Sequence, residues 1–158
     1  MTDLIVNLYE KNYLKETNVQ LKNNEIKINR LLSPDADKLV EFVQSNFTEG
    51  WASEVKAGVY KENPTCFIAS YKGEIIGFAC YDATAKSYFG PMGVSPKFRG
   101  LNVGQMLLLT TLEAMKYDGY GYAIIGSVGE SVQKFYKKHI NFIKSETKPN
   151  LYNRLIKY

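Results

Sequence analysis

The order of apolar and polar residues predicts strands at the beginning of the chain. Leu4–Tyr9 is a short apolar run, which predicts an edge strand, and the polar segment Lys11–Asn24 predicts a loop. Apolar and polar residues then alternate over Glu25–Leu31, which is the period of a half-buried strand. We therefore expect residues 1–24 to be an N-terminal extension of a domain that spans residues 25–158.

Two helices are expected next. Ser33 and Pro34 suit a helix start, because a serine hydroxyl can accept hydrogen bonds from free backbone N–H groups and proline fits the first helical position. Gly50 and Trp51 precede a second, shorter helix over Ala52–Tyr60. The first helix is indicated by apolar residues at helical spacing, namely Leu39, Val40, Phe42, Val43 and Phe47.

The rest of the chain predicts a mixed sheet. Thr65–Ser70 and Glu74–Tyr81 have the composition of a hairpin, and Ser87–Val94 indicates a third strand. Gly90 and Pro91 interrupt this strand, and because proline cannot donate to a ladder we expect a bulge or splay there. The later elements are a long helix Gly100–Asp118, a strand Tyr122–Ser127, a helix Val132–Lys138 and strands Asn141–Ser145 and Leu151–Lys157. This order contains a βαβ crossover and predicts an α/β fold with a mixed sheet flanked by helices.

Composition and charge exclude several classes of protein. The 158 residues are 45% hydrophobic and 23% charged, as in one ordinary globular domain. No apolar run is long enough to cross a bilayer, and the N-terminus lacks the basic region of a secretory signal, so we expect a cytoplasmic protein. Cys66 and Cys80 lie in strand-like runs and are expected to be small buried residues, with no metal site, because there is one histidine and no C-x-x-C pair.

The positive charge is concentrated at the C-terminal end. From Ser131 onward seven basic residues face one acidic residue, which gives +6, so the first 130 residues sum to −2 against a total of +4. Such a segment suits a polyanion or is simply a solvated helix face. Because no nucleic-acid-binding motif accompanies it, we expect neither nucleic acid nor a membrane as partner.

The segment Val94–Gln105 has the properties of an anion site. It joins a strand to the longest helix, and a helix N-terminus exposes free N–H groups and a partial positive charge. Gly100 and Gly104 allow the backbone to approach a pyrophosphate, and Arg99 can add a charge-assisted hydrogen bond. The patterns G-x-G-x-x-G and G-K-[ST] are absent, which disfavours a nicotinamide or flavin enzyme and a P-loop protein.

Two motifs in this part of the chain resemble those of the GNAT superfamily. Arg99-Gly-Leu-Asn-Val-Gly104 is similar to its acetyl-CoA-binding pattern [RQ]-x-x-G-x-[GA], with Asn102 at the usual middle glycine. Asparagine tolerates unusual backbone angles better than most residues, so we expect the site to be retained. The second motif, Phe135-Tyr-Lys-Lys138, resembles the family's F-Y-x-[KR], although Ile140-Asn141 displaces the glycine that usually follows.

The resemblance implies a fold and an activity. The fold would be the GNAT acyl-CoA N-acyltransferase fold, in which helices flank a splayed central sheet. The activity would be transfer of an acetyl group from acetyl-CoA to a primary amine of a small molecule, peptide or protein by direct attack, in a monomer or homodimer without a metal. The alternative is a non-catalytic acyl-CoA-binding sensor or scaffold with the same fold.

The resemblance also implies which residues bind the cofactor. The interrupted strand would contact the pantetheine arm and supply a backbone N–H for the oxyanion, and the loop with the following helix would hold the pyrophosphate. The expected cofactor-binding residues are Met92, Gly93, Val94, Arg99, Gly100, Asn102, Val103, Gly104, Gln105, Phe135 and Lys138.

For catalysis, the resemblance assigns proton donation to the CoA sulfur to Tyr136. The general base stays open: Asp82 and Glu54 come first, then Glu130, and a water chain is the alternative; His139 is more often a surface residue than a base. The acids are scattered along the sequence and do not indicate an acidic acceptor pocket. The aromatic residues that could either line the acceptor pocket or belong to the core are Trp51, Tyr60, Tyr81, Tyr88 and Phe89.

Overall fold

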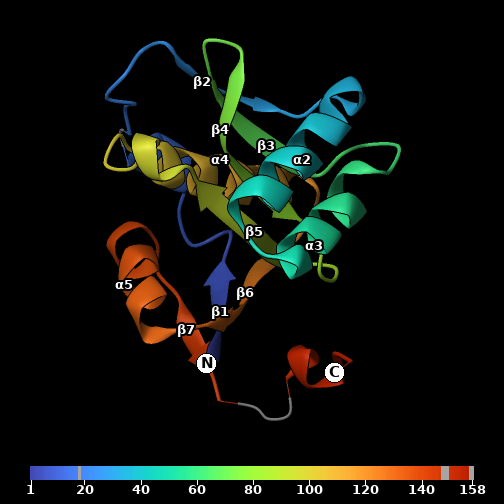
Figure 1. Cartoon of the computed structure of the whole chain (residues 1–158). Coiled ribbons are helices and arrows are strands. Elements are labelled where there is room, and N and C mark those ends of the chain that lie inside the picture. Colours follow the sequence, from blue (N-terminus) through green and yellow to red (C-terminus); the bar gives the residue numbers. More distant parts are fainter. Residues whose placement is uncertain (18, 147–149, 157–158) are drawn as a thin grey trace.

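A computed structural model describes residues 1–17, 19–146 and 150–156 of the chain (Figure 1). The described residues form one mixed seven-stranded sheet in the order β2-β3-β4-β5-β6-β1-β7. Its strands are β1 (Thr2–Asn7), β2 (Ile26–Arg30), β3 (Cys66–Tyr71), β4 (Glu74–Tyr81), β5 (Tyr88–Val94), β6 (Tyr122–Val128) and β7 (Ile143–Ser145). The helices are α1 (Tyr13–Glu16), α2 (Ala36–Asn46), α3 (Glu49–Val59), α4 (Val103–Tyr117) and α5 (Glu130–His139). The predicted mixed α/β sheet flanked by helices is confirmed.

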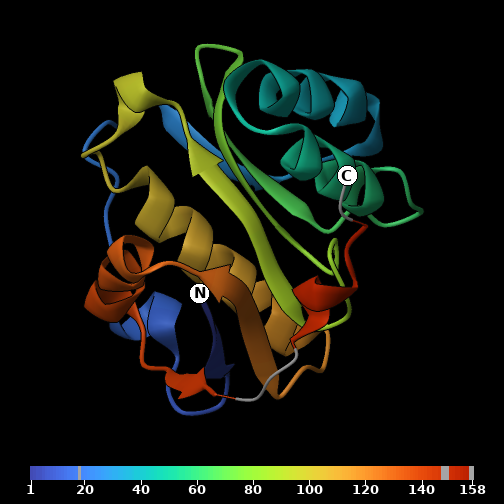
Figure 2. The same ribbon diagram turned by 60° about the horizontal axis from the view of Figure 1, so that its bottom comes forward.

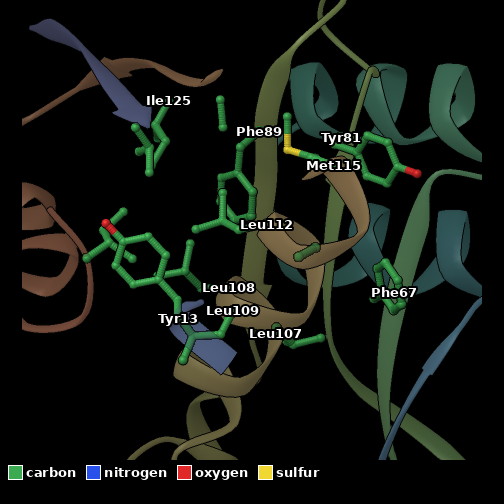
Figure 3. Packing of buried hydrophobic residues seen from close by; sticks show 14 of the residues in the cluster. Tyr13, Phe67, Tyr81, Phe89, Leu107, Leu108, Leu109, Leu112, Met115 and Ile125 are labelled. Carbon is green, nitrogen blue, oxygen red and sulfur yellow. The ribbon is translucent and has the colours of Figure 1, made fainter. Parts of the chain in front are cut away.

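Helices cover both faces of the sheet (Figure 2). On one face α2 and α3 pack on Phe78 and Cys80 of β4. On the other face α4 forms the larger core cluster, in which Phe89 of β5 lies beside Leu112 of α4 (Figure 3). This agrees with the long helix expected over Gly100–Asp118, although α4 begins only at Val103. The residues of α4 in this cluster are Val103, Leu107, Leu108, Leu109, Leu112, Ala114 and Met115.

Two helix starts differ from the prediction. Ser33 does not cap a helix, because Ser33–Asp35 forms a separate 3₁₀ turn (η1) and α2 begins only at Ala36. The helix expected from Ala52 begins earlier, at Glu49, because the Thr48 hydroxyl accepts a hydrogen bond from the N–H of Trp51 at 3.2 Å.

The first strand lies inside the sheet, and the prediction of an edge strand is wrong. β1 is antiparallel to β6 on one side and to β7 on the other. Leu4 and Val6 are fully buried opposite Ile125 and Ala123 of β6. Residues 2–7 therefore belong to the same sheet as the rest of the chain.

The last predicted strand is also wrong where the structure describes it. Leu151–Arg154 forms a 3₁₀ turn (η3) and not a strand, whereas Lys157 of that predicted segment lies outside the described residues. The polar segment Lys11–Asn24 is mostly irregular as expected, but it contains α1. The Tyr13 hydroxyl of α1 accepts a hydrogen bond from the N–H of Asn141 at 3.1 Å, which ties this segment to the approach to β7.

Cys66 and Cys80 are free thiols and fully buried, as the sequence predicted. They face each other across β3 and β4, and burial raises the pKa of the Cys80 thiol. In the part of the chain that the structure describes, no helix has the length and apolar character needed to cross a membrane.

The inner position of β1 predicts a large stability effect. Leu4→Ala is expected to lower the free energy of unfolding by about 2–5 kcal/mol, because it leaves a cavity at a position with 0% exposure. Ile143→Ala in the neighbouring β7, where the side chain is 67% exposed, is the control and should cost about 0.5 kcal/mol or less. Urea denaturation measures both, and equal costs would contradict an inner β1.

Candidate functional site

Strands β5 and β6 separate after a short parallel ladder. They pair only at Tyr88 with Ile124 and at Phe89 with Ile125. Beyond these pairs β5 continues to Val94 with β4 as its partner, while β6 continues toward α5. We call the part of the two strands beyond Phe89 and Ile125 the β5–β6 opening. The splay predicted from Gly90 and Pro91 is confirmed. Among the described strands, none pairs with the second backbone edge of Met92–Val94.

The N-terminus of α4 presents free backbone donors. The first bond of the helix runs from the N–H of Met106 to the carbonyl of Asn102 at 3.0 Å, so the N–H groups of Val103, Gly104 and Gln105 have no partner within the helix. Such a helix start attracts an anion. Arg99 is exposed just before it, and its Nε donates to the carbonyl of Val94 at 3.4 Å.

Asn102, at the position of the motif's middle glycine, has a left-handed backbone conformation. Its φ is +66°, in the left-handed region that asparagine tolerates better than most residues. Its side chain does not cap α4 but donates to the carbonyl of Gln20 at 2.9 Å. Asn102 therefore has a backbone conformation that glycine would also allow, and the segment before β2 holds its side chain.

Three of the predicted cofactor residues meet at Gly104. A Cβ added there would lie 3.5 Å from the Phe135 ring of α5 and 3.7 Å from Val94 of β5. Gly104 thus keeps open the place where β5, α4 and α5 converge. Lys138 is exposed on α5, so it adds a positive charge to the same helix as Phe135. The predicted residues from Met92 to Gln105 form one continuous segment from the β5–β6 opening to the start of α4.

Tyr136 of α5 is buried beside β5. Its ring packs edge-on against Phe89 at 6.3 Å between centroids and against Phe135 at 5.3 Å, and the residue is 6% exposed. Burial raises the pKa of Tyr136 well above its ordinary value. The phenol therefore keeps its proton at neutral pH and can act as a donor at the last β5–β6 pair.

The two carboxylates first considered as base have different surroundings. Glu54 is half-buried on α3 and accepts a hydrogen bond from the Thr84 hydroxyl at 2.6 Å. Both oxygens of Asp82 are occupied, one by the N–H of Ser87 at 2.8 Å and the other by the Tyr120 hydroxyl at 2.7 Å. These bonds hold the β4–β5 loop and give Asp82 a structural role. Its role as general base stays a prediction.

The other two titratable candidates lie on α5. Glu130 is exposed in the first turn of this helix. His139 packs on Phe135 at 4.8 Å between centroids, and burial together with the neighbouring Lys138 lowers the pKa of His139. A neutral imidazole at physiological pH follows from this environment.

The aromatic residues divide between core and site. Tyr81 and Phe89 are core residues, and Tyr81 donates to Asp118 while accepting from Arg30 at 3.3 Å. Burial raises the pKa of Tyr81 to about 12. Trp51 packs on Phe47 and Phe78 of the α2–α3 cluster, and Tyr60 is exposed and bonded to Asp37. Among these candidates, Tyr88 belongs to the β5–β6 ladder next to the opening and is not part of either core cluster.

Two further residues reach the β5–β6 opening from the ends of the chain. The Asp3 carboxylate of β1 accepts a hydrogen bond from the N–H of Ser127 at 2.7 Å. The ring of Tyr152 in η3 lies so close over Gly126 that a Cβ there would overlap it. The one sequence signal for this contact is Gly126 itself, because glycine within a strand often marks the close approach of another group.

No metal centre is found in residues 1–17, 19–146 and 150–156, where no three His, Cys, Asp or Glu side chains are grouped to hold an ion.

The β5–β6 opening and the α4 N-terminus suit an extended ligand with phosphates at one end. The free edge of Met92–Val94 can pair with amide groups, and the three free N–H groups of α4 can bind the phosphates.

Comparison with known proteins gives the family. The model of the acetyltransferase (GNAT) family matches residues 29–142. No curated protein matches the chain.

Several solved structures share the fold. A fungal multi-domain GH3 β-N-acetylglucosaminidase with a GCN5-related glucosamine N-acetyltransferase region has 17% identity and a TM-score of 0.66, over 91% of this chain and 19% of that one. A GCN5-related N-acetyltransferase from Sphaerobacter thermophilus has 16% identity and a TM-score of 0.60, over 89% and 49%. The aminoglycoside acetyltransferase meta-AAC0020, from an uncultured soil sample, has 15% identity and a TM-score of 0.56, over 86% and 95%. The chain thus spans a fifth of the first of these proteins and half of the second, and at these identities the likeness is one of fold.

Proposed function

Because the chain belongs to the GNAT acetyltransferase family, we propose that it transfers an acetyl group from acetyl-CoA to a primary amine. Members of this family use acetyl-CoA. The observation that carries the proposal is the convergence at Gly104 of the β5–β6 opening, the free N–H groups of α4 and the helix that holds Tyr136. Acyl transfer from a CoA thioester needs a place for the pantetheine arm, donors for the pyrophosphate and a proton donor for the sulfur, and these three features would supply them.

The residues available for binding the donor fit its parts. The N–H groups of Val103, Gly104 and Gln105 would hold the pyrophosphate, with Arg99 and Lys138 as nearby positive charges. The free edge of Met92–Val94 would pair with the amide groups of the pantetheine arm. This arrangement directs the thioester into the β5–β6 opening, next to Tyr136.

The chemistry then needs three contributions from the protein. A backbone N–H near Met92–Val94 stabilises the negative charge that develops on the carbonyl oxygen when the amine nitrogen attacks the carbonyl carbon. The new C–N bond replaces the C–S bond, and Tyr136 gives a proton to the departing sulfur. Glu54, directly or through water, takes the proton that the amine loses. The acyl group passes directly to the amine and no residue is acylated.

The test is acetyl transfer to a panel of amines. The protein is incubated with acetyl-CoA and, separately, glucosamine, an aminoglycoside, a diamine and a lysine peptide; the first two are chosen because two similar folds are named for such acceptors. We expect amine-dependent release of CoA thiol, together with an acetylated product in mass spectrometry. Binding of acetyl-CoA without transfer to any amine would instead support the sensor or scaffold alternative.

A further inference from the structure

The acceptor side of the β5–β6 opening can be identified from the direction of its side chains. Phe89 and Ile125 belong to the core cluster of α4 and point to that face of the sheet. Because side chains alternate along a strand, Tyr88 and Gly126 face the opposite side, which α3 covers. The helices α4 and α5, which hold the proposed donor site, lie toward the other face, so the amine would approach from the α3 side.

Tyr152 forms part of this side. Its ring lies directly over Gly126, one residue beyond the last β5–β6 pair, and stands edge-on to the Tyr88 ring at 6.4 Å between centroids. Figure 2 shows the C-terminal turn, in red, beside the end of β5. The turn fixes Tyr152 locally, because the Asn150 side chain accepts from the N–H of Tyr152 at 3.1 Å and Asn153 closes the same capping box.

Polar groups from three distant parts of the chain surround this ring. The Thr84 hydroxyl contacts the Tyr152 hydroxyl and donates to Glu54 at 2.6 Å. Burial, then Glu54 and Asp3, raise the pKa of Tyr152 to about 12, although the Thr84 contact lowers it. Burial and Asp3 likewise raise the pKa of Tyr88. Asp3 therefore acts on both phenols, whereas Glu54 acts on Tyr152 alone.

This combination distinguishes between classes of amine. A linear diamine would use the carboxylates but would leave the aromatic rings of Tyr88 and Tyr152 without a complementary partner. A lysine on a protein surface would need open access, which the ring over Gly126 restricts. An amine on a hydroxylated ring matches all of these groups, since its C–H face packs on an aromatic ring, its hydroxyls bond to carboxylates and phenols, and its ammonium meets negative charge.

We propose that the acceptor is an amino sugar and that Tyr152 and Asp3 bind it on the α3 side of the β5–β6 opening. The proposal rests on the function proposed above and uses the same transfer step. Tyr152 supplies the aromatic surface for the sugar ring. Asp3, held in place by the N–H of Ser127, supplies a carboxylate for the hydroxyl or ammonium groups. Glu54 remains the group that takes the proton.

The experiment compares acceptors and variants. For wild type, Tyr152→Phe, Tyr152→Ala and Asp3→Asn, kcat and KM are measured with glucosamine and with 1,5-diaminopentane, and acetyl-CoA affinity is measured by calorimetry. We expect wild type to prefer glucosamine. Tyr152→Ala and Asp3→Asn should each raise KM for glucosamine by about tenfold with unchanged acetyl-CoA affinity. Tyr152→Phe, which keeps the ring, should retain most of the affinity for glucosamine.

The controls separate this proposal from the proposed function. Tyr122→Ala, at a side chain that is 57% exposed, should change neither KM nor acetyl-CoA affinity. If acetyl-CoA binds and the diamine or a lysine peptide is the better acceptor, the amino-sugar inference is overturned and the acetyltransferase function stands. Unchanged or higher glucosamine activity in Tyr152→Ala would also overturn it. If no amine reacts, saturation-transfer NMR with glucosamine and CoA decides, and no signal on the sugar overturns the inference.

Discussion

Gly104→Glu is expected to weaken acetyl-CoA binding by about a hundredfold or more. The substitution places a side chain and a negative charge among the free N–H groups of Val103, Gly104 and Gln105, where the proposed pyrophosphate lies. It also fills the space between β5, α4 and α5, because even a Cβ at this position contacts Phe135 at 3.5 Å. Isothermal titration calorimetry with acetyl-CoA measures the effect.

Two matched variants separate this effect from misfolding. Gly104→Ala adds only a methyl group at ordinary contact distance, so it should fold normally and retain much of the affinity. Gly121→Glu makes the same chemical change at an exposed glycine with no atom within 4 Å of an added Cβ, and should bind like the wild type. Equal affinities of Gly104→Glu and Gly121→Glu would place the pyrophosphate elsewhere.

Tyr136→Phe is expected to lower kcat by about a hundredfold to ten-thousandfold, the usual contribution of a positioned proton donor. The ring contacts with Phe89 and Phe135 persist in phenylalanine, so acetyl-CoA affinity and the melting temperature should stay close to those of the wild type. Steady-state release of CoA thiol, with calorimetry for the donor, separates the two quantities.

The control for Tyr136 is Tyr122→Phe, which removes a hydroxyl from an exposed side chain and should leave kcat unchanged. If Tyr136→Phe also keeps the wild-type kcat, the thiolate leaves without help from this phenol. Tyr136 would then be a core residue that packs α5 against β5, which is consistent with its burial.

Local patterns in the sequence predicted the local structure of the proposed donor side, and the roles of its residues stay predictions. The splay follows from Gly90 and Pro91, because proline removes a ladder donor whatever surrounds it. The loop before α4 follows from a short motif, and Asn102 has the left-handed backbone angle that asparagine tolerates. The apolar pattern of the α4 helix is repeated over several turns and is therefore also a local signal.

The acceptor side depends on contacts between distant residues, which no local pattern reveals. Leu4–Tyr9 has the pattern of any short apolar strand. Its position between β6 and β7 depends on which strand edges are available for pairing, and those edges belong to distant parts of the chain. The segment that holds Tyr152 has apolar residues suited to a strand, yet Asn150 and Asn153 close a capping box and turn it into a 3₁₀ helix. The contacts of Asp3 and Tyr152 were therefore not predicted.

The carboxylates illustrate the same limit. Asp82 and Glu54 are both plausible bases in sequence, since each lies next to a predicted element that could face the acceptor. Their hydrogen bonds distinguish them. Both oxygens of Asp82 accept hydrogen bonds, from Ser87 in the β4–β5 loop and from Tyr120. Glu54 accepts from the Thr84 hydroxyl, which also contacts the Tyr152 hydroxyl. The hydrogen-bond partners of Asp82 lie 5 and 38 residues away in sequence, and the partner of Glu54 lies 30 residues away. Sequence patterns alone therefore do not distinguish the two carboxylates as candidate bases.

The central claim is that the β5–β6 opening and the N-terminus of α4 together bind an acyl-CoA. Titration of the isotope-labelled wild-type protein with acetyl-CoA, followed through its backbone amide NMR signals, tests this most directly. The account predicts saturable binding at one site, with the largest shifts at Met92–Val94 and Gly100–Gln105. Absence of binding by acetyl-CoA and longer acyl-CoAs, or shifts confined to other parts of the chain, would contradict it.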